Sequence, residues 1–189
     1  VVFLESHGIP ASTALRIYKH YGNDAIKVVR ENPYRLASEV WGIGFSTADS
    51  IASKIGIPHD SPLRTRAGIE YALAQAVEEG HVYLPVEFLE SRCVSLLGID
   101  EDRFREALHT LETEERIVIE DGKVYLPDLH HAENVIASKI AMLLASPPEW
   151  SASVDDLTLQ RIQSESQIVL HTSQVKAIRE GLTSRVMVI

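Results

Sequence analysis

The residues best suited to chemistry are a glycine–isoleucine–glycine turn at Gly42-Ile43-Gly44 and the hydroxyls of Ser46 and Thr47 just after it. Glycines let a ligand approach the backbone closely, and N–H groups at the start of a helix attract anions. Ile43 would anchor the turn in the core. The pattern predicts a phosphate-binding turn, although a tight helix connection that binds nothing is the alternative for a single such turn. The predicted binding residues are Gly42, Ile43, Gly44, Phe45, Ser46 and Thr47.

A second, looser copy of the turn lies about 34 residues earlier in the sequence, at Gly8-Ile9-Pro10. Each copy is followed by an alanine-bearing helix pattern and a glycine stop, at Gly22 and Gly56. Such self-similarity at a short period indicates an internal repeat. Two hairpins in one repeat favour DNA phosphates as the ligand, because duplex DNA offers phosphates at regular spacing. Basic side chains on the hairpin helices that could add contacts are Arg16, Lys19, His20 and Lys54.

Four short helices should position the two hairpins. The helix after Pro10 should bury an apolar stripe that includes Tyr18, and the next short helix should turn Ile26 inward. After the second turn, Ser46 followed three residues later by Asp49 reads as a capping box, which predicts a helix start at Ser46.

Strand and helix patterns then alternate. A helix should run from residue 62 to residue 79, and residues 81–85 are strand-like. Helices are expected at 86–97 and 100–115, and Asp121-Gly122 predicts a β-hairpin over residues 116–127. This is the order of a winged helix–turn–helix. The second of these helices is rich in Glu and Asp, which opposes phosphate contact and favours a structural or protein-contacting role.

The C-terminal residues predict a helix over 129–145, a proline-rich linker over 146–151 and a weak helix over 155–164. A further helix should span 172–182, and residues 185–189 read as a buried parallel strand.

Composition narrows the class of protein. The chain has 189 residues, 45% of them hydrophobic, a formal net charge of -9 and one cysteine, Cys93. No apolar run is long enough to span a membrane, and a single cysteine excludes an internal disulfide and a cysteine-rich zinc site. Residues 1–60 carry six Lys or Arg and six Asp or Glu, so the acidic excess lies beyond them. We expect a cytoplasmic protein that binds DNA through a local N-terminal site, with no membrane partner and no metal, since adjacent His130 and His131 lack a third ligand.

The sequence resembles a known family. Residues 42–52 look like the second hairpin of a helix-hairpin-helix element, and residues 31–58 with 79–85 resemble the N-terminal region of RecD-like DNA helicases of the RecD/TraA family. The likeness runs over almost the whole chain. Members of that family are ATP-dependent 5′–3′ superfamily 1 helicases, with helix-hairpin-helix elements ahead of two RecA-like motor domains. The resemblance implies DNA and the rest of the motor as partners, with ATP and Mg²⁺ as cofactors of the parent protein.

The C-terminal end adds to the resemblance. Residues 170–174 resemble the Q motif before the first motor strand, with Thr172 as the helix cap and Gln174 as the adenine contact of the parent. No G-x-x-x-x-G-K-[ST] phosphate loop occurs in the 189 residues. We therefore expect a non-catalytic fragment without a cofactor of its own, which begins inside a longer protein and stops before the phosphate loop.

The predicted fold is mainly α. Its parts are a tandem helix-hairpin-helix region (1–80), a small winged-helix-like α+β unit (81–128), connecting helices with the linker (129–164) and the first elements of a RecA-like motor domain (165–189). The predicted function is phosphate contact by hairpin amides in a helicase's N-terminal region. One alternative is a scaffold module of a DNA repair or recombination protein without DNA contact. The other is a base-excision glycosylase, which the absence of a hairpin lysine disfavours.

Overall fold

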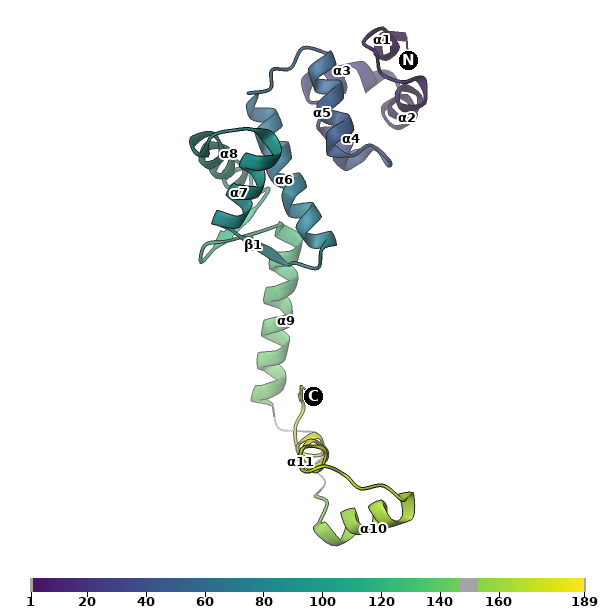
Figure 1. Ribbon diagram of the computed structural model, residues 1–189, viewed down its shortest axis with the longest axis vertical. Coiled ribbons are helices and arrows are strands. Elements are labelled where there is room, and N and C mark those ends of the chain that lie inside the picture. The colour runs from purple at the N-terminus through teal and green to yellow at the C-terminus, as the bar shows by residue number, and fades with distance from the viewer. Residues whose placement is uncertain (1, 147–152, 189) are drawn as a thin grey trace. The chain divides into compact units, whose positions relative to one another are not determined.

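The computed structural model describes residues 2–146 and 153–188, and the chain divides into two compact units, Val1–His130 and His131–Ile189. Figure 1 shows that helices dominate both units, as the sequence predicts. Most of the predicted linker, residues 147–151, lies outside the described residues. None of the described helices is long and apolar enough to cross a membrane.

The first unit begins with two hairpins, each joining a short helix to a longer one. The helices are α1 (Val2–Ser6), α2 (Ala11–Tyr21), the 3-10 turn η1 (Gly22–Asp24), α3 (Ala25–Glu31), α4 (Arg35–Glu39) and α5 (Phe45–Lys54). The predicted repeat is present in three dimensions. Ile9 and Ile43, at equivalent places in the two hairpins, are 2% and 3% exposed in one shared core. The prediction that Ile43 anchors its turn in the core is therefore confirmed.

Two expectations about inward-facing residues are wrong. Tyr18 and Ile26 are 44% and 39% exposed. The helix α3 begins at Ala25, so its buried positions are Ala25, Val28 and Val29, spaced i, i+3 and i+4. The prediction began the helical periodicity at residue 26 instead of residue 25, and it therefore assigned Ile26 to the buried face of the helix.

The predicted capping box at Ser46 is also wrong. The N-cap of α5 is Gly44, with φ −90° and ψ 175°, and Phe45 is the first helical residue. The Asp49 carboxylate is engaged elsewhere, by Arg64 at 2.9 Å and by the Tyr34 hydroxyl at 2.7 Å. An earlier start lets the Phe45 ring enter the core, which outweighs the hydrogen bond that a serine cap would supply.

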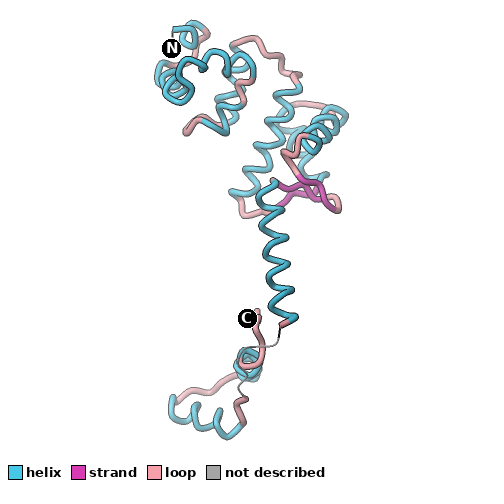
Figure 2. The backbone as a smooth tube through the Cα atoms, turned by 180° about the vertical axis from the view of Figure 1, so that it is seen from behind, coloured by secondary structure: helices cyan, strands magenta, loops and turns pink. Residues whose placement is uncertain are grey.

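A second core lies beyond the hairpins within the same unit. Its elements are α6 (Pro62–Glu78), β1 (Tyr83–Pro85), α7 (Val86–Leu97), α8 (Glu101–Thr113), β2 (Val118–Glu120) and β3 (Lys123–Tyr125). The strands, drawn in magenta in Figure 2, form an antiparallel sheet in the order β1-β3-β2, with Val124 opposite both Leu84 and Ile119. The predicted order of a strand, two helices and a hairpin is thus observed. Positive φ at Asp121 (49°) and Gly122 (73°) forms the predicted hairpin turn.

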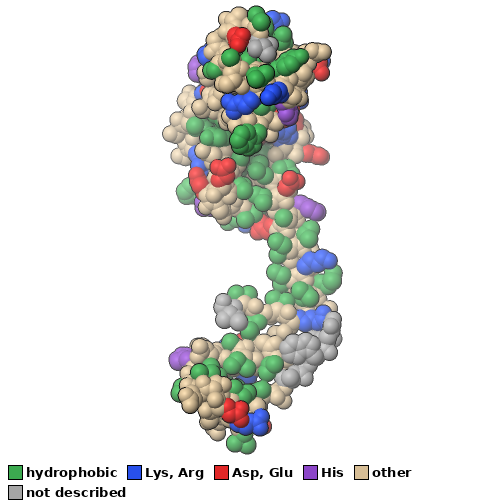
Figure 3. All heavy atoms as spheres, turned by 90° about the vertical axis from the view of Figure 1, so that its right-hand side faces the viewer, with side chains coloured by type: hydrophobic (Ala, Val, Ile, Leu, Met, Phe, Trp, Pro, Cys, Tyr) green, Lys and Arg blue, Asp and Glu red, His purple; other side chains and the backbone are tan. Residues whose placement is uncertain are grey.

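The remaining helices are α9 (Pro127–Ala145), α10 (Asp156–Ser166) and α11 (Thr172–Gly181). No residue of α9 is buried, and hydrophobic side chains line it in Figure 3. The predicted strand over residues 185–189 is not formed in its described part, 185–188. A parallel strand requires hydrogen bonds from a neighbouring strand, and residues 131–146 and 153–188 contain none.

Candidate nucleic-acid interface

The second hairpin is a tight, well-anchored turn. The N–H of Ile43 donates to the carbonyl of Val40 at 3.1 Å, and Gly42 between them has a φ of +77°. Val40 and Ile43 are 5% and 3% exposed. Because both ends of the turn are fixed in the core, the backbone just after it has a defined position.

Four backbone N–H groups at the start of α5 are available to a ligand. In the described chain, the N–H groups of Gly44, Phe45, Ser46 and Thr47 donate to no acceptor, and Gly44 has no side chain to cap them. The first N–H groups of a helix have no acceptor within the helix and lie at the positive end of its dipole. This arrangement suits an anion such as a phosphate.

The first hairpin offers fewer such groups. Its N-cap, Pro10, has no N–H, and Thr13 N–H donates to the Pro10 carbonyl at 2.9 Å. Only the N–H groups of Ala11 and Ser12 stay without an acceptor among the described residues at the start of α2. The two hairpins are therefore unequal, and the second leaves more N–H groups without an acceptor among the described residues.

The two glycines of the second turn differ in whether the fold would tolerate a side chain at their positions. A Cβ on Gly42 would lie 2.5 Å from Arg16 Nη1, and its φ of +77° is one that side chains disfavour. A Cβ on Gly44 would meet no atom within 4 Å, and the φ of Gly44, −90°, is open to any residue. The fold itself thus requires glycine at position 42 but not at position 44. Glycine at position 44 keeps the amides approachable.

Cations lie beside both hairpins. Arg16 Nη1 donates to the Gly42 carbonyl at 3.0 Å, and Lys54 Nζ donates to the Gly8 carbonyl at 2.6 Å. Neither forms an ion pair with a carboxylate in the part of the chain that the structure describes. Basic side chains are exposed in this region in Figure 3.

Arginines in the second core, in contrast, form ion pairs with carboxylates. Arg92, Arg105 and Arg116 pair with Glu79, Glu101 and Glu70 at 2.5, 2.9 and 2.6 Å. Carboxylates therefore neutralise the cations of this core, whereas those beside the hairpins remain open to an anion.

Comparison with known proteins identifies this region. Residues 1–83 match the family model described as the ATP-dependent RecD2 DNA helicase HHH domain. The chain is also 34% identical over 167 residues to the ATP-dependent RecD2 DNA helicase of Deinococcus radiodurans. The chain is RecD-like, with a RecD2-type helix-hairpin-helix domain at its N-terminus. The alignment covers 81% of this chain, and the chain spans only 23% of that relative.

Some predicted contacts in the RecD2-type domain can act only through the backbone. The Phe45 ring is 5% exposed and stacks between Tyr34 and Tyr71, with ring centroids at 5.8 and 5.0 Å. The side chains of Ile9 and Ile43 are equally buried. Direct DNA contact by these three side chains is excluded, whereas Gly8, Pro10, Gly44, Ser46 and Thr47 are exposed.

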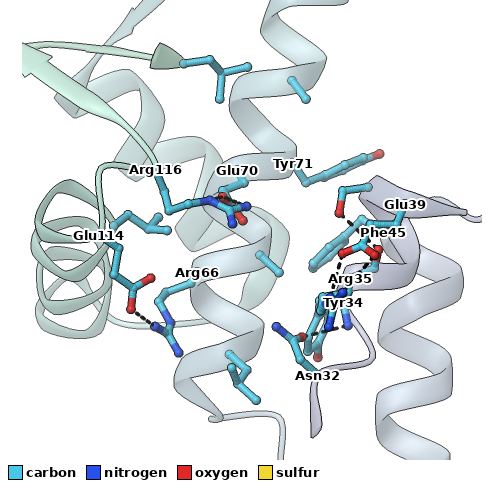
Figure 4. A pocket seen from close by; sticks show the side chains of 17 residues that line it. Asn32, Tyr34, Arg35, Glu39, Phe45, Arg66, Glu70, Tyr71, Glu114 and Arg116 are labelled. Carbon is cyan, nitrogen blue, oxygen red and sulfur yellow. Dashed lines mark hydrogen bonds and ion pairs between the residues drawn. The ribbon is translucent and has the colours of Figure 1, made fainter. Parts of the chain in front are cut away.

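A pocket of about 450 Å³ lies between the second hairpin and α6, and the Phe45 ring lines it (Figure 4). Its arginines are paired with glutamates, Arg35 with Glu39 and Arg66 with Glu114, each at 2.7 Å. The hydrogen bond from Arg35 holds the pKa of Glu39 below its usual range, so the carboxylate stays charged. Since its cations are compensated, this pocket is a poor phosphate site.

The nucleotide residue predicted for the parent, Gln174, has a structural contact in the second unit. Its Oε1 accepts a hydrogen bond from the His171 N–H at 2.8 Å, in the first turn of α11. The N-cap is His171, whose Nδ1 accepts from the Ser173 N–H at 3.3 Å, so the prediction that Thr172 caps this helix is wrong. Among the described residues there is no group of three or more metal-ligating side chains.

Sequence reasoning missed one residue of the turn. Trp41 is 92% exposed, immediately before Gly42. An apolar residue in a hairpin is usually assigned to the core. Trp41 lies between Val40 and Ile43, which both anchor the turn in the core. This position in the sequence could have indicated that its side chain faces outward.

Proposed function

We propose that this chain is the DNA-binding N-terminal region of an ATP-dependent 5′–3′ superfamily 1 DNA helicase. The hairpins contact DNA phosphates through backbone N–H groups, chiefly those at the start of α5. The observation that carries this proposal is the set of four N–H groups at residues 44–47 that have no acceptor among the described residues, beside an open Gly44. The match to a RecD2 HHH domain supports it.

Catalysis belongs to the parent protein in this proposal. The 189 residues contain no phosphate-loop motif, and without its lysine and cradle of N–H groups the γ-phosphate would have no binding site. ATP and Mg²⁺ would bind to the rest of the motor. Gln174 would contribute an adenine contact through its Nε2, because its Oε1 already accepts from His171.

The decisive variant is Gly44→Asp. The backbone of Gly44 is already that of an N-cap, so an aspartate there caps α5 and leaves the fold as stable or a few tenths of a kcal/mol more stable. The same carboxylate occupies the free N–H groups and repels a phosphate. We expect about tenfold weaker binding to duplex DNA in an anisotropy titration, with a salt dependence shallower by about one unit of slope.

The matched control is Ser95→Asp, which adds the same charge at an exposed position of α7, outside both hairpins. It should leave DNA affinity within about twofold of the original chain. Equal affinities of the Gly44→Asp variant and the original chain would contradict the proposal.

The second candidate function is a protein-contacting scaffold. The observation that favours it is the charge pairing in the second core, where each of four arginines forms an ion pair with a glutamate. Absence of DNA binding by the chain at any salt concentration in the same titration would favour the scaffold function over DNA contact.

A further inference from the structure

The most exposed large hydrophobic side chain of the second hairpin is an indole ring. Trp41 is 92% exposed, while Val40 before it and Ile43 after Gly42 are 5% and 3% exposed. Tryptophan is usually well buried, because its ring is the largest apolar group among the side chains. Its exposure, in a turn whose ends are buried, leaves the ring open to contact with a ligand.

The backbone from which this ring projects is held in a fixed place. The turn is closed by the hydrogen bond from Ile43 N–H to the Val40 carbonyl at 3.1 Å. Arg16 holds the Gly42 carbonyl from the neighbouring helix at 3.0 Å. The indole therefore projects from a rigid turn that leads directly into the free N–H groups of residues 44–47.

The two hairpins differ in how they hold an aromatic ring before the turn. The residue 34 positions before Trp41 is His7, whose ring packs on Phe3 with centroids 4.4 Å apart. Among the described residues, Trp41 makes no ring contact with another aromatic side chain. The ring of His7 thus packs on α1, whereas the ring of Trp41 lies in solvent.

The surroundings of Trp41 fit a single flat ligand better than a protein partner. The exposed neighbours along the chain are Ser38 and Glu39 on one side and Gly42, Gly44, Ser46 and Thr47 on the other, all small or polar. A protein interface would require a contiguous apolar patch rather than one ring. An isolated indole beside a phosphate site matches a nucleotide, which carries a phosphate and a flat base together.

We propose that Trp41 stacks on the open face of a nucleobase, so that the second hairpin binds a junction of single-stranded and duplex DNA in preference to continuous duplex. This inference rests on the proposed function and specifies the form of DNA that the second hairpin binds. Bases inside a duplex have both faces covered by neighbours, whereas an unpaired base or a terminal base pair exposes one. Base–aromatic stacking is tolerant of sequence, because every base has a π face.

The test compares Trp41→Ala and Trp41→Phe with the original chain on two DNAs of equal duplex length. One is a dumbbell closed at both ends, and the other carries a forked single-stranded end. Trp41→Ala should weaken binding to the fork about tenfold and binding to the dumbbell less than twofold. Trp41→Phe should restore most of the fork affinity, because it keeps a ring. Equal losses on both DNAs, or no loss on either, would overturn the inference.

A second readout uses fluorescence. The chain contains two tryptophans, so Trp150→Phe leaves Trp41 as the sole indole. Stacking predicts quenching of its emission by the forked DNA and little change with the dumbbell. Unquenched emission at saturating fork would overturn the inference. Fork binding that is separately weakened by Gly44→Asp would show that the phosphate site stands even so, while absent binding of either DNA by the original chain would remove both proposals.

Discussion

Arg16 on α2 donates from Nη1 to the carbonyl of Gly42 in the other hairpin, at 3.0 Å and across 26 residues of sequence. The contact is reciprocated, since Lys54 on α5 donates to the carbonyl of Gly8 at 2.6 Å. The long helix of each hairpin unit therefore holds the turn of the other. The two cations also offset the negative ends of carbonyls that would face an approaching phosphate.

These cross-contacts should stabilise the domain. We predict that Arg16→Met and Lys54→Met each lower the free energy of unfolding by about 1 kcal/mol, the usual net value of a solvent-accessible hydrogen bond. Urea denaturation measures this. Lys19→Met, at an exposed position of α2, is the control for loss of a charge and should change stability by less than about 0.5 kcal/mol. A loss in the control as large as that in Arg16→Met would count against the cross-contact.

The two glycines of the second turn provide a matched pair of stability tests. Gly42→Ala should destabilise the protein by about 1 kcal/mol or more, because φ is +77° and the new Cβ would displace Arg16. Gly44→Ser should be neutral or stabilising by a few tenths of a kcal/mol, since serine is a good N-cap. Thermal unfolding of both variants gives the comparison, and similar losses in the two would contradict the distinction.

The sequence was sufficient for the hairpin pair because its information is local. Gly8 and Gly42 lie in the turns, Ile9 and Ile43 in the core, and each pair is separated by the same period. The hairpin at Asp121-Gly122 follows from turn chemistry in the same way.

Other features depend on residues distant in sequence. Either Gly44 or Ser46 could cap α5, and the choice follows from the stacking of Phe45 between Tyr34 and Tyr71. The exposure of Trp41 likewise depends on which side chains lie near it in the folded chain. Single-sequence periodicity contains no such information about neighbours in space.

A buried ion pair joins α5 of the second hairpin to α6 of the second core. The Arg64 side chain, 8% exposed, binds both oxygens of Asp49 at 2.9 and 3.1 Å and donates to the Leu97 carbonyl at 2.7 Å. Arg64→Met should destabilise the protein by about 3–5 kcal/mol, because it leaves the Asp49 carboxylate without a cation and with only the Tyr34 hydroxyl as a donor. In urea denaturation, the double variant with Asp49→Leu should lose less than Arg64→Met alone. A double variant as unstable as the sum of the single ones would refute the pairing.

Cys93 on α7 gives a prediction with a defined pH window. The thiol is fully buried, and burial raises its pKa to about 12, with a small opposing effect of Arg92. The folded pKa lies above the value of about 8.5 for an exposed thiol, so the buried thiol favours folding fully below about pH 8.5. That contribution falls as the pH rises from about 8.5 towards 12, because only the unfolded chain ionises readily in this window.

Reaction of Cys93 with a thiol reagent tests this burial directly. Only the thiolate reacts, and only opening of the core between α6, α7 and α8 exposes it. At pH 8 in native buffer we expect labelling far slower than in urea, with a rate that rises with urea concentration. Cys93→Ala, which has no thiol, fixes the background, and its stability should decline less between pH 8.5 and pH 10 than that of the original chain. Rapid complete labelling under native conditions would show that α7 does not hold this side chain in the core.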